Sequence, residues 1–210
     1  MNTVNVSSNF SVPPSGAKGL VIIDYGAGNI QSIQFALQRL GHQGVLSNSV
    51  SEILAADKII FPGVGEASSA MKKLRESGLD IVIPKLKQPV LGICLGMQLM
   101  CKSSEEGNTK GLGIFDVDCL KYSKAVKVPQ MGWNTIYNLK SKIFDGIDEN
   151  QHMYLVHSFF APKCAQTIAT TRYETEYSSA LQQNNFFGTQ FHPEKSGKIG
   201  EQILNNFLKL

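Results

Sequence analysis

Residues 89–102 read PVLGICLGMQLMCK, and this is the most informative stretch of the chain. The apolar residues 89–93 predict a short buried strand, and residues 97–102 predict the first turns of a helix. The Gly-Ile-Cys-Leu-Gly sequence across this junction has the pattern of a nucleophile elbow, a tight strand-to-helix turn that exposes its middle side chain. A sulfur at this turn meets the positive end of the helix, which favours the thiolate. Cys94 is therefore a candidate nucleophile.

A buried structural cysteine is the competing interpretation of Cys94, because cysteine is among the residue types most often found in protein cores. The two interpretations are separated by whether the chain also offers a base, and a group that orients the base.

Around the elbow, apolar runs of strand length alternate with segments of helical periodicity. The expected strands are 20–24, 45–46, 58–61 and 89–93, and the expected helices are 30–40, 49–55, 66–76 and 97–102. Such alternation predicts an α/β fold with a doubly wound, mostly parallel sheet and helices on both faces. The second half favours strands, at 115–122, 133–139, 153–156, 167–172, 179–181 and 186–190, with a last helix over 198–208. We therefore expect an antiparallel β extension of the same sheet.

The composition fits a folded domain of ordinary size, with 210 residues, 42% of them hydrophobic, and a net charge of +3. We expect residues 19–210 to form a single domain and the polar residues 1–18 to form a flexible extension or leader. Scattered lysines and the lack of a long apolar stretch argue against nucleic acid and membrane partners. The four cysteines have neither disulfide-framework nor metal-ligand spacing. Reduced thiols, no metal and a cytoplasmic location are expected.

The chain has only four histidines, so the search for a base is short. His42 and His152 lie in polar contexts that are typical of exposed histidines. His157 follows an expected strand and can line a site at the end of that strand.

The fourth histidine, His192, follows the expected strand 186–190 and precedes Pro193. Proline stops the strand, which presents the imidazole at the edge of the sheet. Glu194, two residues on, returns to the same side and can accept a hydrogen bond from the ring. With Cys94 these residues predict a Cys-His-Glu triad suited to acyl transfer.

Acyl transfer also requires donors for an oxyanion. The N–H group of Leu95 is the natural first donor, because it directly follows the nucleophile. The glycine-rich loop Gly63-Val64-Gly65 is a candidate for the second, although a plain strand-helix turn explains the same residues. Gln98 lies one helical turn after Cys94, where a carboxamide can bind a polar substrate.

Six ordered motifs resemble the class I glutamine amidotransferases, and within them the glutaminase-subunit family of imidazole glycerol phosphate synthase. The resemblance covers residues 19–210, and its motifs lie at 23–29, 62–65, 92–98, 127–134, 156–158 and 191–196. The elbow and the His-Pro-Glu sequence are common to the superfamily. The Asp-Tyr-Gly-Ala-Gly-Asn opening, the Pro-Gly-Val-Gly loop and residues 127–134 are specific to the subunit family.

By this resemblance, Cys94 attacks the side-chain carboxamide of L-glutamine, His192 transfers the proton, and Glu194 orients the imidazole. The resemblance gives the Gly63-Val64-Gly65 loop a part in the oxyanion hole, completed when a partner is engaged. It implies that Gln98 and Glu106 hold the amide and amino ends of glutamine. From the residues alone, Glu106 and its neighbour Glu105 suggest only a solvated acidic pair. His157 and Ser158 join the expected glutamine-binding set, and no cofactor is implied.

The resemblance also implies a partner. The family delivers ammonia to a (β/α)8-barrel cyclase subunit, as a heterodimer that makes imidazole glycerol phosphate and an aminoimidazole carboxamide ribotide for histidine biosynthesis. The residues expected on the docking face are Met131, Trp133, Tyr154 and Lys195.

The sequence departs from the family pattern at three positions. Gln130 replaces a common histidine, Glu66 a small residue and Phe159 a common tyrosine. Two alternatives remain open at this point: a related glutaminase that supplies ammonia for sugar amidine synthesis, and an inactive scaffold that only binds a partner. The intact set of Cys94, His192 and Glu194 argues against the scaffold.

Overall fold

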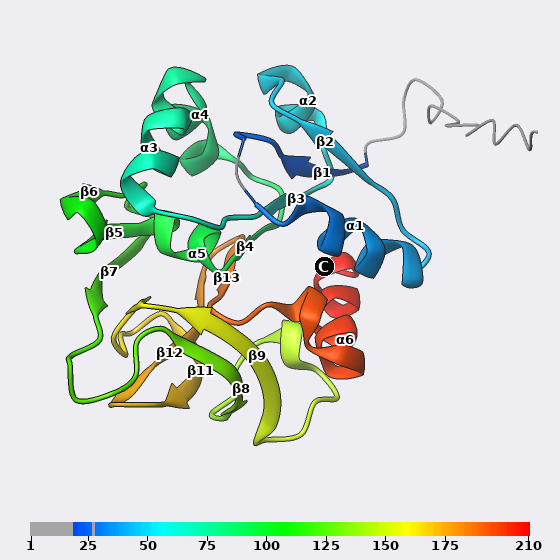
Figure 1. Cartoon of the computed structure of the whole chain (residues 1–210). Helices are drawn as coiled ribbons and strands as arrows, with labels where there is room; N and C mark the ends of the chain where they lie inside the picture. The colour runs from blue at the N-terminus through cyan, green and yellow to red at the C-terminus, as the bar shows by residue number, and fades with distance from the viewer. Residues whose placement is uncertain (1–18, 27) are drawn as a thin grey trace, which may run out of the picture.

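The computed structural model describes residues 19–26 and 28–210, so the expected extension at 1–18 lies outside the described residues. The main sheet has the strand order β11-β12-β13-β4-β3-β1-β2 (Figure 1). Strands β13, β4, β3, β1 and β2 run parallel to one another. At one end of the sheet, β12 pairs antiparallel with β13, and β11 pairs antiparallel with β12. The strand bounds are β1 Leu20–Ile23, β2 Gly44–Ser47, β3 Lys58–Phe61, β4 Val90–Ile93, β11 Thr167–Arg172, β12 Glu176–Gln183 and β13 Phe186–Thr189. This arrangement confirms the predicted parallel sheet with its antiparallel extension.

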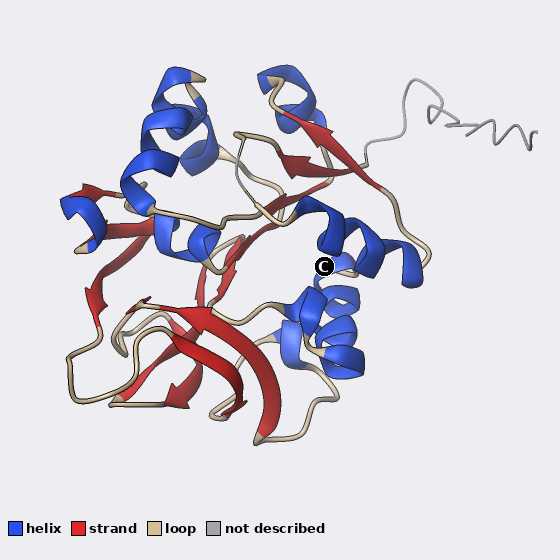
Figure 2. Cartoon of the chain, in the orientation of Figure 1, coloured by secondary structure: helices blue, strands red, loops and turns tan. Residues whose placement is uncertain are grey.

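Helices cover both faces of this sheet, as predicted (Figure 2). Neighbouring strand residues point to opposite faces, so Val21 and Ile23 enter one core while Leu20 and Ile22 enter the other. Helices α2 to α5 close the first core, and α1 and α6 close the second. The helix bounds are α1 Ile30–Arg39, α2 Val50–Ala55, α3 Ala67–Glu76, α4 Leu79–Val82, α5 Leu95–Met100 and α6 Gly197–Leu208. Four 3-10 helices accompany them within the described ranges: η1 Ile83–Lys85, η2 Glu106–Asn108, η3 Lys142–Phe144 and η4 Pro193–Lys195.

Two smaller sheets lie beside the main one in the described part of the chain. One has the order β10-β7-β5-β6, and the other is a ribbon of β8 and β9. Their bounds are β5 Cys101–Ser104, β6 Thr109–Lys110, β7 Phe115–Lys121, β10 Phe159–Phe160, β8 Gln130–Ile136 and β9 Gln151–His157. The ribbon pairs antiparallel from Gln130 opposite His157 to Ile136 opposite Gln151. It therefore begins three residues before the predicted strand 133–139.

The helix after the elbow differs from the predicted 97–102. It begins at Leu95 and ends at Met100, and residues 101 and 102 belong to β5. The N–H groups of Leu112 and Ile114 donate to the carbonyl oxygens of Leu99 and Met100, at 2.8 and 2.9 Å. The last helical carbonyls are satisfied by a distant segment, so the chain leaves the helix and joins a second sheet.

Among the helices of the described ranges, none is long and apolar enough to cross a membrane.

Candidate active site

The elbow is built by close packing around a strained residue. Cys94 lies between β4 and α5 with a φ of +53°, in a region that L side chains rarely adopt. Gly96 allows the turn to lie against β3, because a Cβ there would come within 2.0 Å of the Phe61 carbonyl oxygen. The Cys94 N–H donates to the Thr189 carbonyl at 2.7 Å, which ties the turn to β13. These contacts present the sulfur at the carboxyl end of the parallel strands.

His192 is fixed by hydrogen bonds to its backbone N–H, its backbone carbonyl and one ring nitrogen. Its N–H donates to the Tyr154 carbonyl at 2.9 Å, and its carbonyl accepts from the Ser196 hydroxyl at 2.7 Å. Nδ1 lies 2.8 Å from Glu194 Oε1, with both side chains almost fully buried. A carboxylate accepts, so Nδ1 carries the hydrogen and Nε2 keeps its lone pair when the ring is neutral. The predicted histidine–glutamate pair therefore forms.

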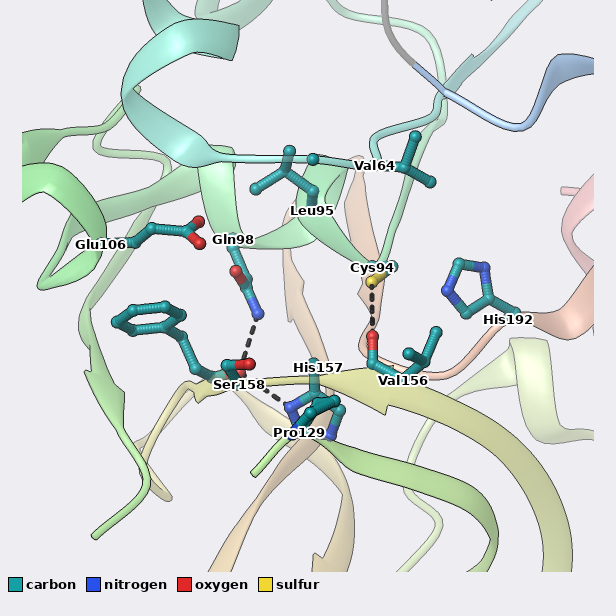
Figure 3. A pocket seen from close by; sticks show the side chains of 12 residues that line it. Val64, Cys94, Leu95, Gln98, Glu106, Pro129, Val156, His157, Ser158 and His192 are labelled. Carbon is teal, nitrogen blue, oxygen red and sulfur yellow. Dashed lines mark hydrogen bonds between the residues drawn. The ribbon is translucent and has the colours of Figure 1, made fainter. Parts of the chain in front are cut away.

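Cys94 and His192 face each other across one pocket of about 310 Å³ (Figure 3). Nε2 of His192 is buried and has no hydrogen-bond partner among the described residues. Burial lowers the pKa of His192, but the Cys94 sulfur and the Glu194 carboxylate outweigh it and raise the pKa to about 10. The imidazole is thus suited to hold a proton beside a thiolate.

Most of the predicted site residues line this pocket. They are Val64, Gly65, Cys94, Leu95, Gln98, Glu106, His157, Ser158 and His192. Glu194 is not among the lining residues and contacts the ring of His192 instead. Gly63 also lies off the pocket, because it packs on the elbow, where a Cβ would come within 2.5 Å of the Gly96 nitrogen.

Glu106 joins the pocket to the glycine-rich loop. Its Oε2 accepts a hydrogen bond from the Ala67 N–H at 2.8 Å, at the first residue of α3. Partial burial raises the pKa of Glu106; the Ala67 hydrogen bond lowers it, and the Glu66 carboxylate raises it. The carboxylate of Glu106 therefore lies at the end of the Gly63-Val64-Gly65 loop. The interpretation as a solvated acidic pair was wrong for Glu106, which is partly buried, whereas Glu105 is exposed.

His157 lines the pocket but uses its ring nitrogens inside the protein. Nδ1 lies 2.8 Å from the Phe159 carbonyl oxygen, and Nε2 lies 3.3 Å from the Tyr177 hydroxyl. Burial lowers the pKa of His157 to about 4, against the smaller raising effect of the hydrogen bond to Phe159. The ring is therefore neutral at pH 7. The two other histidines, His42 and His152, are exposed as predicted.

The four residues expected on a docking face gather beside the pocket. Met131 and Trp133 are 65% and 57% exposed on β8, which is unusual for side chains of this kind. Trp133 stands opposite Tyr154 in the ribbon, with their ring centroids 6.1 Å apart. Lys195 Nζ lies 5.9 Å from the Tyr154 ring centroid, and that ring lies 6.4 Å from the ring of His192.

The three departures from the family pattern occupy different environments. Gln130 is buried, and its Oε1 lies 3.0 Å from the hydroxyls of both Tyr122 and Tyr177. It therefore faces the interior and not the exposed surface of the ribbon. Glu66 precedes α3 and accepts from the Ser68 hydroxyl at 2.6 Å. Phe159 is half-buried and contributes its carbonyl oxygen to the site.

Sequence reasoning missed Gln190. This side chain is fully buried, and its Nε2 lies 3.6 Å from the Cys94 sulfur. The available signal was its spacing: two residues before His192, it falls on the same side of an extended chain. Pro129, Val156 and Phe159 also line the pocket and were not predicted as site residues. No cluster of three or more histidine, cysteine or acidic side chains in the described residues is placed to hold a metal.

Comparison with known proteins agrees with this architecture. Residues 21–210 match the family described as "Glutamine amidotransferase class-I". A solved structure titled "glutamine amidotransferase" aligns with a TM-score of 0.72 at 18% identity, over 91% of this chain and 98% of the other. PurLQS from Thermotoga maritima aligns with a TM-score of 0.69 at 15% identity, over 90% and 97%. The fold and the family match define the class of protein, a class-I glutamine amidotransferase.

Sequence relatives narrow this class. The imidazole glycerol phosphate synthase subunit HisH of Bacteroides fragilis is 53% identical over 91% of this chain and 99% of its own length. The subunit of the same name from Yersinia pseudotuberculosis is 44% identical over the same shares. The chain belongs to the HisH family.

Proposed function

We propose that this protein is the glutaminase subunit of imidazole glycerol phosphate synthase, acting in histidine biosynthesis. Residues 19–210 act as its catalytic domain. It hydrolyses L-glutamine to glutamate and ammonia through a thioester on Cys94. The observation that carries the proposal is the buried, unpartnered Nε2 of His192, in the same pocket as the Cys94 sulfur and with Glu194 on the opposite nitrogen.

The reaction begins when His192 takes the thiol proton and the Cys94 sulfur attacks the side-chain carbonyl carbon of glutamine. The carbon–nitrogen bond then breaks, and His192 gives its proton to the departing ammonia. Water, deprotonated by the same ring, attacks the thioester, and glutamate leaves as the thiol is restored. Glu194 keeps Nδ1 as the donor and stabilises the imidazolium in each step.

The oxyanion of each tetrahedral intermediate requires donors above the sulfur. The Leu95 N–H, directly after the nucleophile, supplies one, and the Gly63-Val64-Gly65 loop supplies the second. Val64 and Gly65 line the pocket, whereas Gly63 supports the loop from below. Because Glu106 holds the end of this loop at Ala67, binding of the substrate ammonium to Glu106 also acts on the loop.

The glutamine site uses the polar groups that converge on the pocket. Gln98 binds the amide end and Glu106 the amino end, with His157 and Ser158 forming the wall between β9 and β10. Because both ring nitrogens of His157 are engaged inside the protein, this residue contributes shape and not a hydrogen bond.

Ammonia released in water at neutral pH becomes ammonium, which is not a nucleophile, so it has to pass directly to the enzyme that uses it. The partner is the (β/α)8-barrel cyclase subunit, docked on Met131, Trp133, Tyr154 and Lys195. The support is the exposure of Met131 and Trp133 and the contact between the rings of Tyr154 and His192. The four cysteines, which are free thiols in the described structure, favour a cytoplasmic setting.

The test is glutamate release in the presence of a histidine-pathway cyclase subunit and its substrate. We expect little glutaminase activity from the free chain and at least tenfold stimulation by the pair, since a single oxyanion donor is worth about 100-fold or more. Stimulation only by an acceptor enzyme of sugar amidine synthesis would instead assign the chain to that enzyme as its partner.

Cys94→Ala is the matched variant for this test. It should abolish glutamate release while leaving the thermal midpoint and the affinity for the cyclase subunit unchanged. Turnover at the parental rate in this variant would show that the nucleophile is elsewhere. The packing cysteine Cys119, buried in the core, provides a control, and Cys119→Ala should keep turnover within a few-fold.

A further inference from the structure

A chain of hydrogen bonds runs from a backbone carbonyl to the sulfur of Cys94. Gln98 Nε2 lies 2.8 Å from the Phe159 carbonyl oxygen and 2.8 Å from Gln190 Oε1. Gln190 Nε2 lies 3.6 Å from the Cys94 sulfur, within the range of a hydrogen bond to sulfur. Gln98 and Gln190 are buried, so water does not compete for these contacts.

The donor and the acceptor of each hydrogen bond in this series follow from the first acceptor, the Phe159 carbonyl. A backbone carbonyl can only accept, so Gln98 must present its amide nitrogen to Phe159. The second hydrogen of that nitrogen then requires an acceptor in Gln190, which places Oε1 of Gln190 toward Gln98. The nitrogen of Gln190 is left toward the sulfur. The amide orientations are thus determined by one unambiguous acceptor. Flipping Gln98 would oppose its Oε1 to two acceptors, and flipping Gln190 would oppose two N–H donors.

This order has a consequence for Cys94. An N–H donor next to the sulfur stabilises the thiolate more than the thiol, because hydrogen bonds to charged acceptors are the stronger ones. The donor is a neutral amide that does not titrate, so it leaves proton transfer to His192. Gln190 and His192 lie two residues apart just after β13. Gln190 contacts the Cys94 sulfur, and His192 faces Cys94 across the pocket.

The order also has a consequence for Gln98. Both N–H groups of its amide are used inside the described structure, so Oε1 is the atom available to a ligand in the pocket. An acceptor there attracts the N–H groups of a carboxamide and repels a carboxylate. Glutamine is thereby favoured over the product glutamate.

Resting on the proposed glutaminase activity, we propose that Gln190 is a further catalytic residue. It donates a hydrogen bond to the Cys94 thiolate, and through its other end it orients Gln98 to read the amide of the substrate. One buried side chain thereby links the nucleophile to substrate recognition.

The test uses two substitutions in the complex with the cyclase subunit. Gln190→Met keeps the size and removes both hydrogen bonds; Gln190→Glu keeps an acceptor for Gln98 and removes the donor to sulfur. The readouts are the pH profile of Cys94 alkylation by iodoacetamide, kcat and KM for glutamine, and inhibition by glutamate. Gln183→Met is the matched control, because Gln183 makes an amide–amide hydrogen bond with Gln166 at 3.0 Å, outside the pocket.

In Gln190→Met we expect alkylation to move about one pH unit higher, kcat to fall about tenfold, and KM to rise, with stronger inhibition by glutamate. Gln190→Glu should slow alkylation and lower kcat but keep KM near that of the parent. The control should leave all three readouts unchanged. An unmoved alkylation profile in both Gln190 variants would overturn the proposal.

The alkylation profile also separates this inference from the proposed function. Iodoacetamide reacts with Cys94 whether or not glutamine is the substrate, so the contact between Gln190 and the sulfur is tested independently. If Cys94→Ala kept full glutaminase activity, the proposed function would fail even with a shifted profile. If Cys94→Ala were inactive and the profile stayed unmoved, only the inference about Gln190 would fail.

Discussion

At the scale of single residues, burial assigns opposite roles to two histidines of one pocket. Among the described residues, His157 contacts the Phe159 carbonyl and the Tyr177 hydroxyl and no carboxylate, and its burial keeps the ring neutral. His192 is buried to a similar degree, but the neighbouring Cys94 sulfur and Glu194 carboxylate outweigh the effect of burial and raise its pKa, so the charged ring is favoured. The difference lies in the partners and not in the exposure of the rings.

The neutral ring of His157 predicts a loss of stability in acid. The unfolded histidine binds a proton below its ordinary pKa of 6.5, whereas the folded one does so only near 4. Between these values the unfolded state binds more protons, so the free energy of unfolding falls as the pH falls, by about 3 kcal/mol in total. This pH dependence of the free energy of unfolding is measured by denaturant unfolding of the parent and of His157→Gln at several pH values from 7 to 4.

The variant should lose most of this pH dependence, because its amide does not titrate in the window. His152→Gln is the control, since His152 is exposed on the same strand, β9. Equal pH dependence in the parent and in His157→Gln would contradict the assignment of a neutral, buried ring.

At the scale of elements, the elbow depends on backbone contact between α5, β3 and β4. Its strand, its turn and the histidine after β13 were predictable, since apolar runs, glycines and proline act through local sterics. The end of α5 was not predictable, because its carbonyls are satisfied by residues 112–114. Gln190 was missed for a related reason. Its orientation is set by the Phe159 carbonyl in another sheet, and no local pattern records that contact.

The contact between α5 and β3 predicts that Gly96→Ala is strongly destabilising. The added methyl group would overlap the Phe61 carbonyl oxygen, which is backbone and cannot rotate away. We expect the free energy of unfolding to fall by roughly 3 kcal/mol or more, measured by denaturant titration.

Gly113→Ala is the comparison for this variant, because a Cβ at Gly113 meets open space and only the positive φ of +68° opposes it. That strain costs about 1–2 kcal/mol. Equal losses in the two variants would mean that close packing of the elbow is not what requires glycine at position 96.

At the scale of the whole molecule, the β8–β9 ribbon lies next to the pocket, since Val156 and His157 of β9 line it and the ring of Tyr154 lies 6.4 Å from that of His192. The inner side of the ribbon is buried through residues such as Met153 and Leu155. The outer side carries Met131 and Trp133, the large side chains that interfaces use as anchors. The sequence pointed to these residues through the family resemblance and through the apolar, aromatic composition of residues 129–133, although a lone tryptophan is often part of a core.

The proposed docking face predicts that Trp133→Ala weakens binding of the cyclase subunit by at least tenfold, as expected for the loss of an aromatic anchor. The thermal midpoint of the free chain should hardly change, because the ring is mostly exposed. Titration calorimetry with the cyclase subunit measures the affinity. Ile81→Ala is the control, since Ile81 is 61% exposed on α4, away from the ribbon. A loss of affinity shared by both variants would argue against a localised anchor.

The hydrogen bond from the His192 N–H to the Tyr154 carbonyl joins the ribbon's main chain to the histidine that we propose as the base. The outward side chains of the ribbon and its backbone are therefore under different constraints. On the proposed function, we expect the outward side chains of the ribbon to change with the partner, whereas the course of its backbone is fixed by the position of the His192 ring. Hybrid subunits that borrow the partner preference of another species should accordingly be made by grafting side chains onto this ribbon, and not by exchanging the ribbon itself.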